Sequence, residues 1–130
     1  MNRKELTDYI TETYSVQPDF PFMQYPDVAV FRHENNRKWF AVIMNVQKSQ
    51  LGMKGDGAVD IVNLKCDPIL SGSLRNEKGY YTAYHMSKTN WISVVPDGTD
   101  DEEKIKWLID ISFDLTAKKL KKKGNKSDEF

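Results

Sequence analysis

The sequence has very little of what an exported or membrane-embedded protein of this size needs. Cys66 is the single cysteine among 130 residues, so no internal disulfide can form. No apolar run approaches the length that spans a bilayer, and the segment from Met1 to Leu6 has no apolar stretch of the kind that directs secretion. These absences predict a cytoplasmic protein without a membrane-spanning segment.

Residue patterns that carry common chemistries are also missing. The two histidines, His33 and His85, show no spacing with Cys66 that fits a closed zinc site. The glycine-rich stretch 52–57 lacks the Gly-Lys-Ser/Thr ending of a phosphate-binding loop and is interpreted as a flexible strand connection. Neither paired catalytic carboxylates nor a Ser-His-Asp order can be discerned. We therefore expect a protein that is not an enzyme and that holds no metal or other cofactor.

Cys66 needs separate consideration, because it immediately precedes the cap of a predicted helix. The positive end of a helix can lower the pKa of a thiol and make it a nucleophile. Such chemistry would also need His33 or His85 nearby, and nothing in the sequence brings either histidine to the cysteine. Since lone cysteines are usually small buried apolar side chains, we interpret Cys66 in that way.

Acidic and basic residues balance overall but are unevenly distributed. Residues 28–96 carry nine basic and five acidic side chains, a net +4, whereas 1–27 carry net −3 and 97–117 net −5. Residues 118–130 carry six basic and two acidic side chains, and we expect this lysine-rich tail to be disordered. A basic middle region favours an anionic partner, but a dedicated DNA-binding domain is usually more basic than this one.

Hydrophobic periodicity and turn signals predict a single α+β domain over residues 1–117. Helix starts are indicated by capping-box spacing from Asn2 to Glu5, by Asp67-Pro68, and by the acidic run from Thr99 to Glu102. These signals predict a first helix ending near Tyr14, a short helix to about Leu74, and a last helix reaching at least Thr116. The predicted strands cover residues 28–33, 38–46, 58–64, 80–86 and 91–95.

The predicted order is therefore α-β(5)-α, with the short helix between the third and fourth strands. Two long terminal helices can cover one face of a five-stranded antiparallel sheet, which leaves the other face partly open. We expect the first two strands and the last two strands to form hairpins, with tips at residues 33–38 and 86–91. A functional site would lie on the open face or at these tips.

Several short motifs are distributed from the first helix to about Thr116. They are Val30-Phe31-Arg32-His33, Lys38 to Met44, Val59-Asp60-Ile61, Lys65-Cys66-Asp67-Pro68, Ala83 to Lys88, Trp91-Ile92 and Asp97-Gly98. Together they resemble the MmcQ/YjbR family of bacterial proteins, and the resemblance implies a fold similar to CyaY/frataxin. It also implies a "double wing", in which two β-hairpins are proposed to contact DNA.

The two hairpin tips supply the candidate nucleic-acid-binding residues. Lysine and arginine contacts to phosphate provide most non-specific affinity, and asparagine can also read a base edge. The alternative is that the tips are polar because they are solvated, and that nearby aromatics form cross-strand pairs or core. The candidates are Arg32, His33, Arg37, Lys38, His85, Lys88 and Asn90.

These residues predict a monomeric DNA-binding module, and the sequence does not identify a protein partner for it. Two other functions remain open. The open sheet face could bind a protein or a small ligand, and exposure of Trp39 or Trp91 would favour this function. The frataxin-like fold also suggests iron binding by the acidic residues of the last helix. Capping and compensation of the helix dipole explain the first four of them without a metal. These acidic residues are Asp100, Asp101, Glu102, Glu103 and Asp110.

Overall fold

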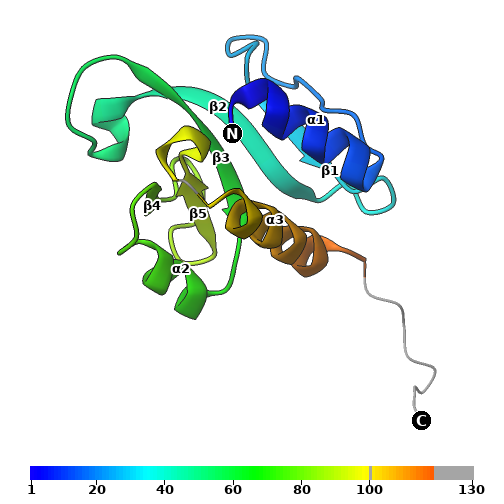
Figure 1. Cartoon of the computed structure of the whole chain (residues 1–130). Helices are drawn as coiled ribbons and strands as arrows, with labels where there is room; N and C mark the ends of the chain where they lie inside the picture. Colours follow the sequence, from blue (N-terminus) through cyan, green and yellow to red (C-terminus); the bar gives the residue numbers. More distant parts are fainter. Residues whose placement is uncertain (100, 119–130) are drawn as a thin grey trace.

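A computed structural model describes residues 1–99 and 101–118 of the chain (Figure 1). Five strands form one open antiparallel sheet in the order β1-β2-β3-β5-β4, which confirms the predicted fold class. The strands are Ala29–Arg32 (β1), Trp39–Gln47 (β2), Ala58–Lys65 (β3), Tyr80–Thr82 (β4) and Trp91–Val94 (β5), and the helices are Arg3–Tyr14 (α1), Pro68–Leu74 (α2) and Glu102–Thr116 (α3), with single 3₁₀ turns at Lys48–Leu51 (η1) and Pro96–Gly98 (η2).

The two terminal helices cover the same face of the sheet, as predicted (Figure 1). Successive side chains of a strand alternate between faces, so β2 directs Ala41 and Ile43 into this helix-covered core and Val42 to the opposite face. Tyr14 of α1 stacks on Phe113 of α3 with ring centroids 4.5 Å apart, which ties the two helices together. The helices contribute Leu6, Ile10, Ile105, Leu108 and Ile109 to the core.

Two of the three predicted helix starts are confirmed in detail. Asn2 Oδ1 accepts from the Glu5 amide and Glu5 Oε1 accepts from the Asn2 amide, both at 2.8 Å. Asp67 Oδ1 accepts from the Leu70 amide at 2.9 Å. The start of α3 was placed wrongly, because Thr99 is still extended and Asp101 caps the helix instead.

The fourth strand is shorter than the predicted 80–86, because the backbone leaves the sheet after Thr82. The Tyr84 amide donates to Ser93 Oγ at 2.9 Å, and the Tyr84 carbonyl accepts from Asn63 Nδ2 at 3.0 Å. Asn63 and Ser93 are fully buried and lie on the face opposite the helices. Residues 83–90, here called the crossing loop, therefore start out across the open face rather than continuing a hairpin.

A second irregular segment, residues 16–28, also lies on the open face and is here called the strap. It pairs with β1 through a bridge in which Asp19 and Val30 exchange both backbone hydrogen bonds at 2.8 Å. Beneath the strap and the crossing loop, the sheet carries two small apolar clusters, one around Val42 and one around Ile61. The open face is thus bounded on two sides, and the space between the two segments forms the candidate site.

Of the predicted tail 118–130, only Lys118 lies within the described residues. Over residues 1–99 and 101–118, no helix is both long and apolar enough to cross a bilayer.

Candidate ligand-binding pocket

The two arginines of the first hairpin are both directed at one carboxylate of the strap. Arg32 Nε donates to Asp19 Oδ2 at 2.7 Å, and Arg37 Nη2 donates to the same oxygen at 3.2 Å. The Arg32 guanidinium also lies 5.4 Å from the ring centroid of Trp39, within the range of a cation–π contact. These contacts bind the strap to the hairpin, and the Asp19 carboxylate thereby compensates one of the three lysine and arginine charges predicted at this tip.

His33 points inward and does not project from the hairpin tip as predicted. Only 6% of its surface is exposed, and Nε2 lies 2.9 Å from both the Phe113 carbonyl oxygen and Thr116 Oγ1. Burial lowers the pKa of His33. Asn36 of the same turn donates to the Thr116 carbonyl at 2.8 Å. The turn therefore contacts carbonyl groups in the last turn of α3, where the backbone of the helix supplies no amide partner.

The other predicted residues are exposed, and two of them lie at one end of the sheet. Arg32 pairs with Trp39 and Lys65 pairs with Trp91, so the turn 34–38 and the crossing loop leave the sheet at the same end. Within this region, Lys88 Nζ donates back to the Ala83 carbonyl at 3.3 Å. Lys38, His85, Lys88 and Asn90 are exposed. Lys38 and Asn90 directly precede β2 and β5 at this end, whereas His85 packs on Tyr84 over the open face and is not brought to them.

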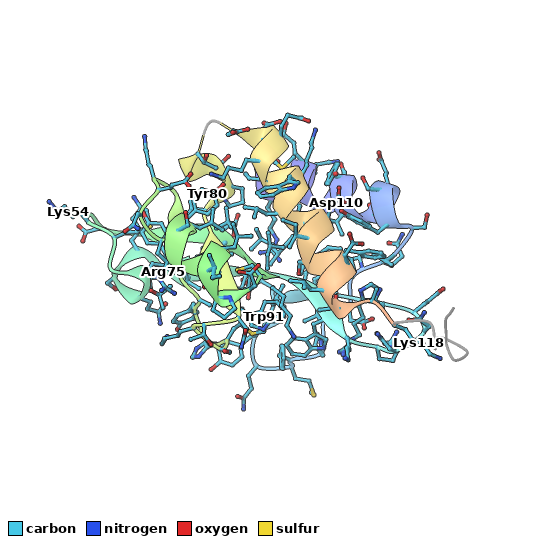
Figure 2. All side chains as sticks on the ribbon, turned by 90° about the horizontal axis from the view of Figure 1, so that it is seen from below. Lys54, Arg75, Tyr80, Trp91, Asp110 and Lys118 are labelled. Carbon is cyan, nitrogen blue, oxygen red and sulfur yellow. The ribbon has the colours of Figure 1, made fainter. Side chains whose placement is uncertain are left out.

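The remaining basic residues are spread over the molecule. In Figure 2, Lys54 and Lys118 lie at opposite ends with Arg75 between them. Lys54 and Arg75 of the middle region therefore lie apart from each other, and Lys118 of the tail lies apart from both.

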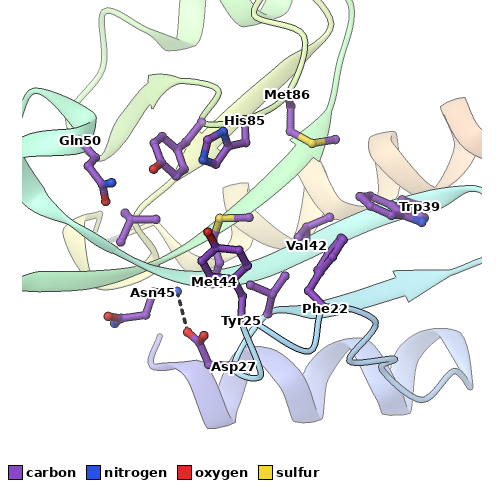
Figure 3. A pocket seen from close by; sticks show the side chains of 13 residues that line it. Phe22, Tyr25, Asp27, Trp39, Val42, Met44, Asn45, Gln50, His85 and Met86 are labelled. Atoms are coloured by element: carbon purple, nitrogen blue, oxygen red, sulfur yellow. Dashed lines mark hydrogen bonds between the residues drawn. The ribbon is translucent and has the colours of Figure 1, made fainter.

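A concave surface lies on the open face, between the strap, β2 and the crossing loop (Figure 3). Its volume is about 560 Å³, which falls in the range of small-molecule sites. Aromatic, methionine and valine side chains make up most of its lining, with a few polar groups among them. It is lined by Phe22, Tyr25, Asp27, Val28, Trp39, Val42, Met44, Asn45, Val46, Gln50, Tyr84, His85 and Met86.

The crossing loop is fixed over the pocket by a buried polar pair. Ser93 Oγ donates to Asn63 Oδ1, and the two side chains together hold the amide and carbonyl of Tyr84. His85 follows with φ of 61°, an uncommon left-handed conformation for a residue with a side chain. The Tyr84 and His85 rings pack with centroids 4.0 Å apart, and Met86 completes this wall of the pocket.

The strap is held at both ends and carries the opposite wall. Asp19 is held by the backbone bridge to β1, while Asp27 Oδ2 accepts from the Asn45 amide of β2 at 3.3 Å. Between these points Phe22 meets Trp39 edge to face, with ring centroids 6.1 Å apart. Residues 20–26 contain no charged side chain and several exposed large apolar ones, namely Phe20, Phe22, Met23 and Tyr25.

Sequence reasoning located this site only in part. The open face was predicted as one place for a site, with exposure of Trp39 or Trp91 as the supporting observation. His85 was selected as a nucleic-acid-binding residue and not as part of a ligand pocket. Trp91 is buried and does not line the pocket. The strap residues Phe22 and Tyr25 were missed, although an uncharged apolar stretch between two prolines, Pro21 and Pro26, is unusual for a solvated connection.

Cys66 packs in the helix-side core, as interpreted from the sequence. Burial, followed by the nearby charge of Asp67, raises the pKa of its thiol to about 11. The thiol is therefore protonated at neutral pH and shielded from solvent, and both conditions oppose a nucleophilic role.

The acidic residues at the start and in the middle of α3 have partners within α3, in α1 and at the amino terminus. Asp101 Oδ1 accepts from the Lys104 amide at 3.0 Å, Glu103 pairs with Lys106 at 3.3 Å, and Asp110 accepts from the Tyr14 hydroxyl. Glu102 lies 3.6 Å from the amino terminus. Within residues 1–99 and 101–118, no group of three or more His, Cys, Asp or Glu side chains is placed to hold a metal ion, and Asp100 lies outside that part.

Comparison with known proteins places this arrangement in a family. The family described as YjbR matches residues 11–115. The uncharacterized protein YyaQ of Bacillus subtilis (strain 168) is 44% identical over 116 residues, which are 89% of this chain and 98% of that protein. The uncharacterized protein YbdF of Escherichia coli O157:H7 is 38% identical over 71 residues, which are 52% of this chain and 57% of that protein.

Solved structures agree with the fold. A crystal structure of a Pseudomonas syringae protein superposes with a TM-score of 0.88 at 44% identity, over 90% of this chain and all of that one. A Deinococcus radiodurans crystal structure gives a TM-score of 0.67 at 24% identity, over 91% of this chain and 80% of that one, and shows the fold alone.

Proposed function

This chain belongs to the YjbR family, and we propose that within it the protein is a binding module that takes a small, largely apolar ligand on the open sheet face. The observation that carries the proposal is the pocket of about 560 Å³ lined by aromatic and methionine side chains from three separate segments. Apolar lining with a few polar groups is typical of ligand sites. The proposed module is a monomeric cytoplasmic protein that performs no catalysis.

The pocket is supported from outside, which explains why its apolar walls do not collapse onto each other. Polar contacts at Asp19 and Asp27 hold the strap, and Asn63 with Ser93 holds the crossing loop. A site whose walls are already fixed costs little ordering entropy when a ligand enters. The arrangement therefore favours specific binding in a preformed pocket over non-specific binding to an exposed apolar surface.

Titration with the neutral fluorescent dye phenylnaphthylamine tests this proposal. We expect a saturable fluorescence rise at one site, and Trp39→Ala should weaken the dye about tenfold because a large ring is removed from the wall. Trp107→Ala is the matched control, since Trp107 is half exposed on α3 and lies outside the pocket. Equal affinities of the two variants, or no saturable signal in the unmodified protein, would contradict the proposal.

Nucleic-acid binding is a second candidate, supported by the common end of the sheet from which both predicted tips leave. Lys38, Lys88 and Asn90 are exposed there, and an amide or ammonium group can contact phosphate or base edges. The ion pairs of Arg32 and Arg37 with Asp19 and the burial of His33 reduce the number of free cations at this surface. We therefore rank nucleic-acid binding second to ligand binding in the pocket.

Duplex and single-stranded oligonucleotides titrated at low and moderate salt test the second candidate. Replacing both Lys38 and Lys88 with alanine should weaken binding and lower the salt slope by about 2, since each phosphate contact contributes roughly one. Lys54→Ala, in the β2–β3 connection at the opposite end of the sheet, should leave the slope unchanged. Absence of salt-dependent binding at micromolar protein would remove this candidate.

A further inference from the structure

Apart from the imidazole of His85, the charged side chains of the pocket lining are of one sign. Asp27 is the single carboxylate among the thirteen lining residues, and no lysine or arginine lines the pocket. An anionic ligand would have to leave water without meeting a fixed cation in this lining, which is unfavourable. A cationic ligand would meet a carboxylate at one end of the pocket.

The charge of Asp27 is only partly compensated by its neighbours. Arg3 Nη1 lies 3.9 Å from Asp27 Oδ2 and 3.5 Å from Asp60 Oδ1, so one guanidinium is shared between two carboxylates. Arg3 also donates through Nη2 to the main-chain carbonyl of Asp27 rather than to its side chain. This group of three charged residues carries a net −1, and the Asp27 side chain is 51% exposed.

The aromatic walls are suited to the same sign of charge. Ring faces attract cations through the negative potential above and below the ring. The protein already uses this interaction at the far end of the pocket, where the Arg32 guanidinium lies over Trp39 while its Nε is bonded to Asp19. Arg32 lies outside the lining, so it does not supply a countercharge inside the pocket. Three other rings line the pocket, those of Phe22, Tyr25 and Tyr84 (Figure 3).

We infer that the ligand is an organic cation, a protonated amine or quaternary ammonium group attached to an apolar, flat body. The cationic group would sit near Asp27 and the neighbouring rings, and the apolar body would lie along β2 toward Trp39. This inference rests on the proposed function of the pocket and adds the chemical class of its ligand.

Three compounds of similar size separate the inference from the proposed function. Benzyltrimethylammonium and neopentylbenzene have the same shape and differ in a nitrogen cation against a carbon, and phenylacetate supplies the opposite charge. In displacement of phenylnaphthylamine, we expect the cation to bind at least about fivefold more tightly than neopentylbenzene, with phenylacetate weakest. Equal displacement by the cation and neopentylbenzene would overturn the inference and leave the proposed function standing. Failure of the dye itself to bind would remove both.

A pair of acidic variants tests the role of the carboxylate. In Asp27→Asn the side chain can still accept from the Asn45 amide, but its charge is gone, so the ratio of cation affinity to neopentylbenzene affinity should fall toward 1, with the aromatic rings keeping part of the preference. Asp56→Asn removes the same charge from an exposed loop outside the pocket and should preserve the ratio. Because both affinities are measured in the same variant, a general loosening of the strap does not alter the ratio. An unchanged ratio in Asp27→Asn, or an equal fall in both variants, would overturn the inference.

Discussion

His33 is an ionisable side chain held in a mostly apolar environment, and its burial should make folding stability depend on pH. Burial lowers the pKa of His33 below the ordinary value, although the Phe113 carbonyl and the Asp114 charge oppose this effect. Below about pH 6.5 the unfolded chain therefore binds a proton more readily than the folded protein. The contribution of His33 is fully present above that pH, and it is lost progressively as the pH falls toward its lower folded value.

Urea unfolding of His33→Gln between pH 7 and pH 5 checks this expectation. Glutamine can still donate toward Phe113 but does not titrate, so the variant should lose less stability over this interval than the unmodified protein. His85→Gln is the matched control, because His85 is exposed. If His33→Gln keeps the full pH dependence, the buried histidine is not its source.

Gly79 occupies a position that other residues cannot adopt without strain. Its φ is +92°, and a Cβ built there would lie 3.0 Å from the Gly98 carbonyl oxygen. We expect Gly79→Ala to lower the free energy of unfolding by about 2 kcal/mol, measured by urea denaturation. Gly57→Ala is the control, since its φ is +97° but no atom lies within 4 Å of the added carbon. A loss no larger than that of Gly57→Ala would show that the contact with Gly98 costs nothing.

The elements that could be predicted are those whose signals are local in sequence. The starts of α1 and α2 depend on hydrogen bonds between residues three positions apart, so Asn2 and Asp67 identify them directly. The end of β4 depends instead on Asn63 and Ser93, which are 30 residues apart and meet only in the folded sheet. The sequence predicts that the strand continues to residue 86, whereas in the structure this distant polar pair binds the Tyr84 backbone outside the sheet.

The same distinction between local and distant signals explains which parts of the candidate site could be predicted from the sequence. The open face follows from counting helices and strands, but the strap that borders it is irregular and has no periodic pattern. Phe22 and Tyr25 reach the pocket because Asp19 and Asp27 attach the strap to β1 and β2, and neither attachment has a sequence signature. His85 was selected as a basic tip residue, whereas the structure places it in the pocket wall.

Ser93→Ala tests whether the buried pair holds the crossing loop in place. The change leaves the Tyr84 amide without its acceptor and Asn63 Oδ1 without its donor, which should lower the free energy of unfolding by about 1–3 kcal/mol. Amide hydrogen exchange at Tyr84 should accelerate more than exchange in α3, because the loop is released before the core. Ser73→Ala, an exposed site in α2, is the control. Unchanged protection at Tyr84 would show that the loop is held by something else.

The sheet divides the molecule into a face that supplies stability and a face that supplies binding. The helix-covered side contains the larger core, while the open side carries two small clusters beneath segments held mainly by polar contacts. Since the walls of the pocket belong to those segments rather than to the core, changes on the two faces should have separable effects.

A pair of truncations tests this division. Leu108→Ala should lower the free energy of unfolding by about 2–5 kcal/mol, because Leu108 is 1% exposed in the main core, but it should leave dye affinity unchanged in the folded fraction. Tyr84→Ala should cost less stability, because Tyr84 is only partly buried, and should weaken the dye about tenfold. Urea titrations give the free energy of unfolding of each variant, and dye titrations give the dye affinity of each. A large loss of affinity in Leu108→Ala would mean that the pocket is shaped by the helix-side core, because α1 and α3 would then act through the sheet on its opposite face.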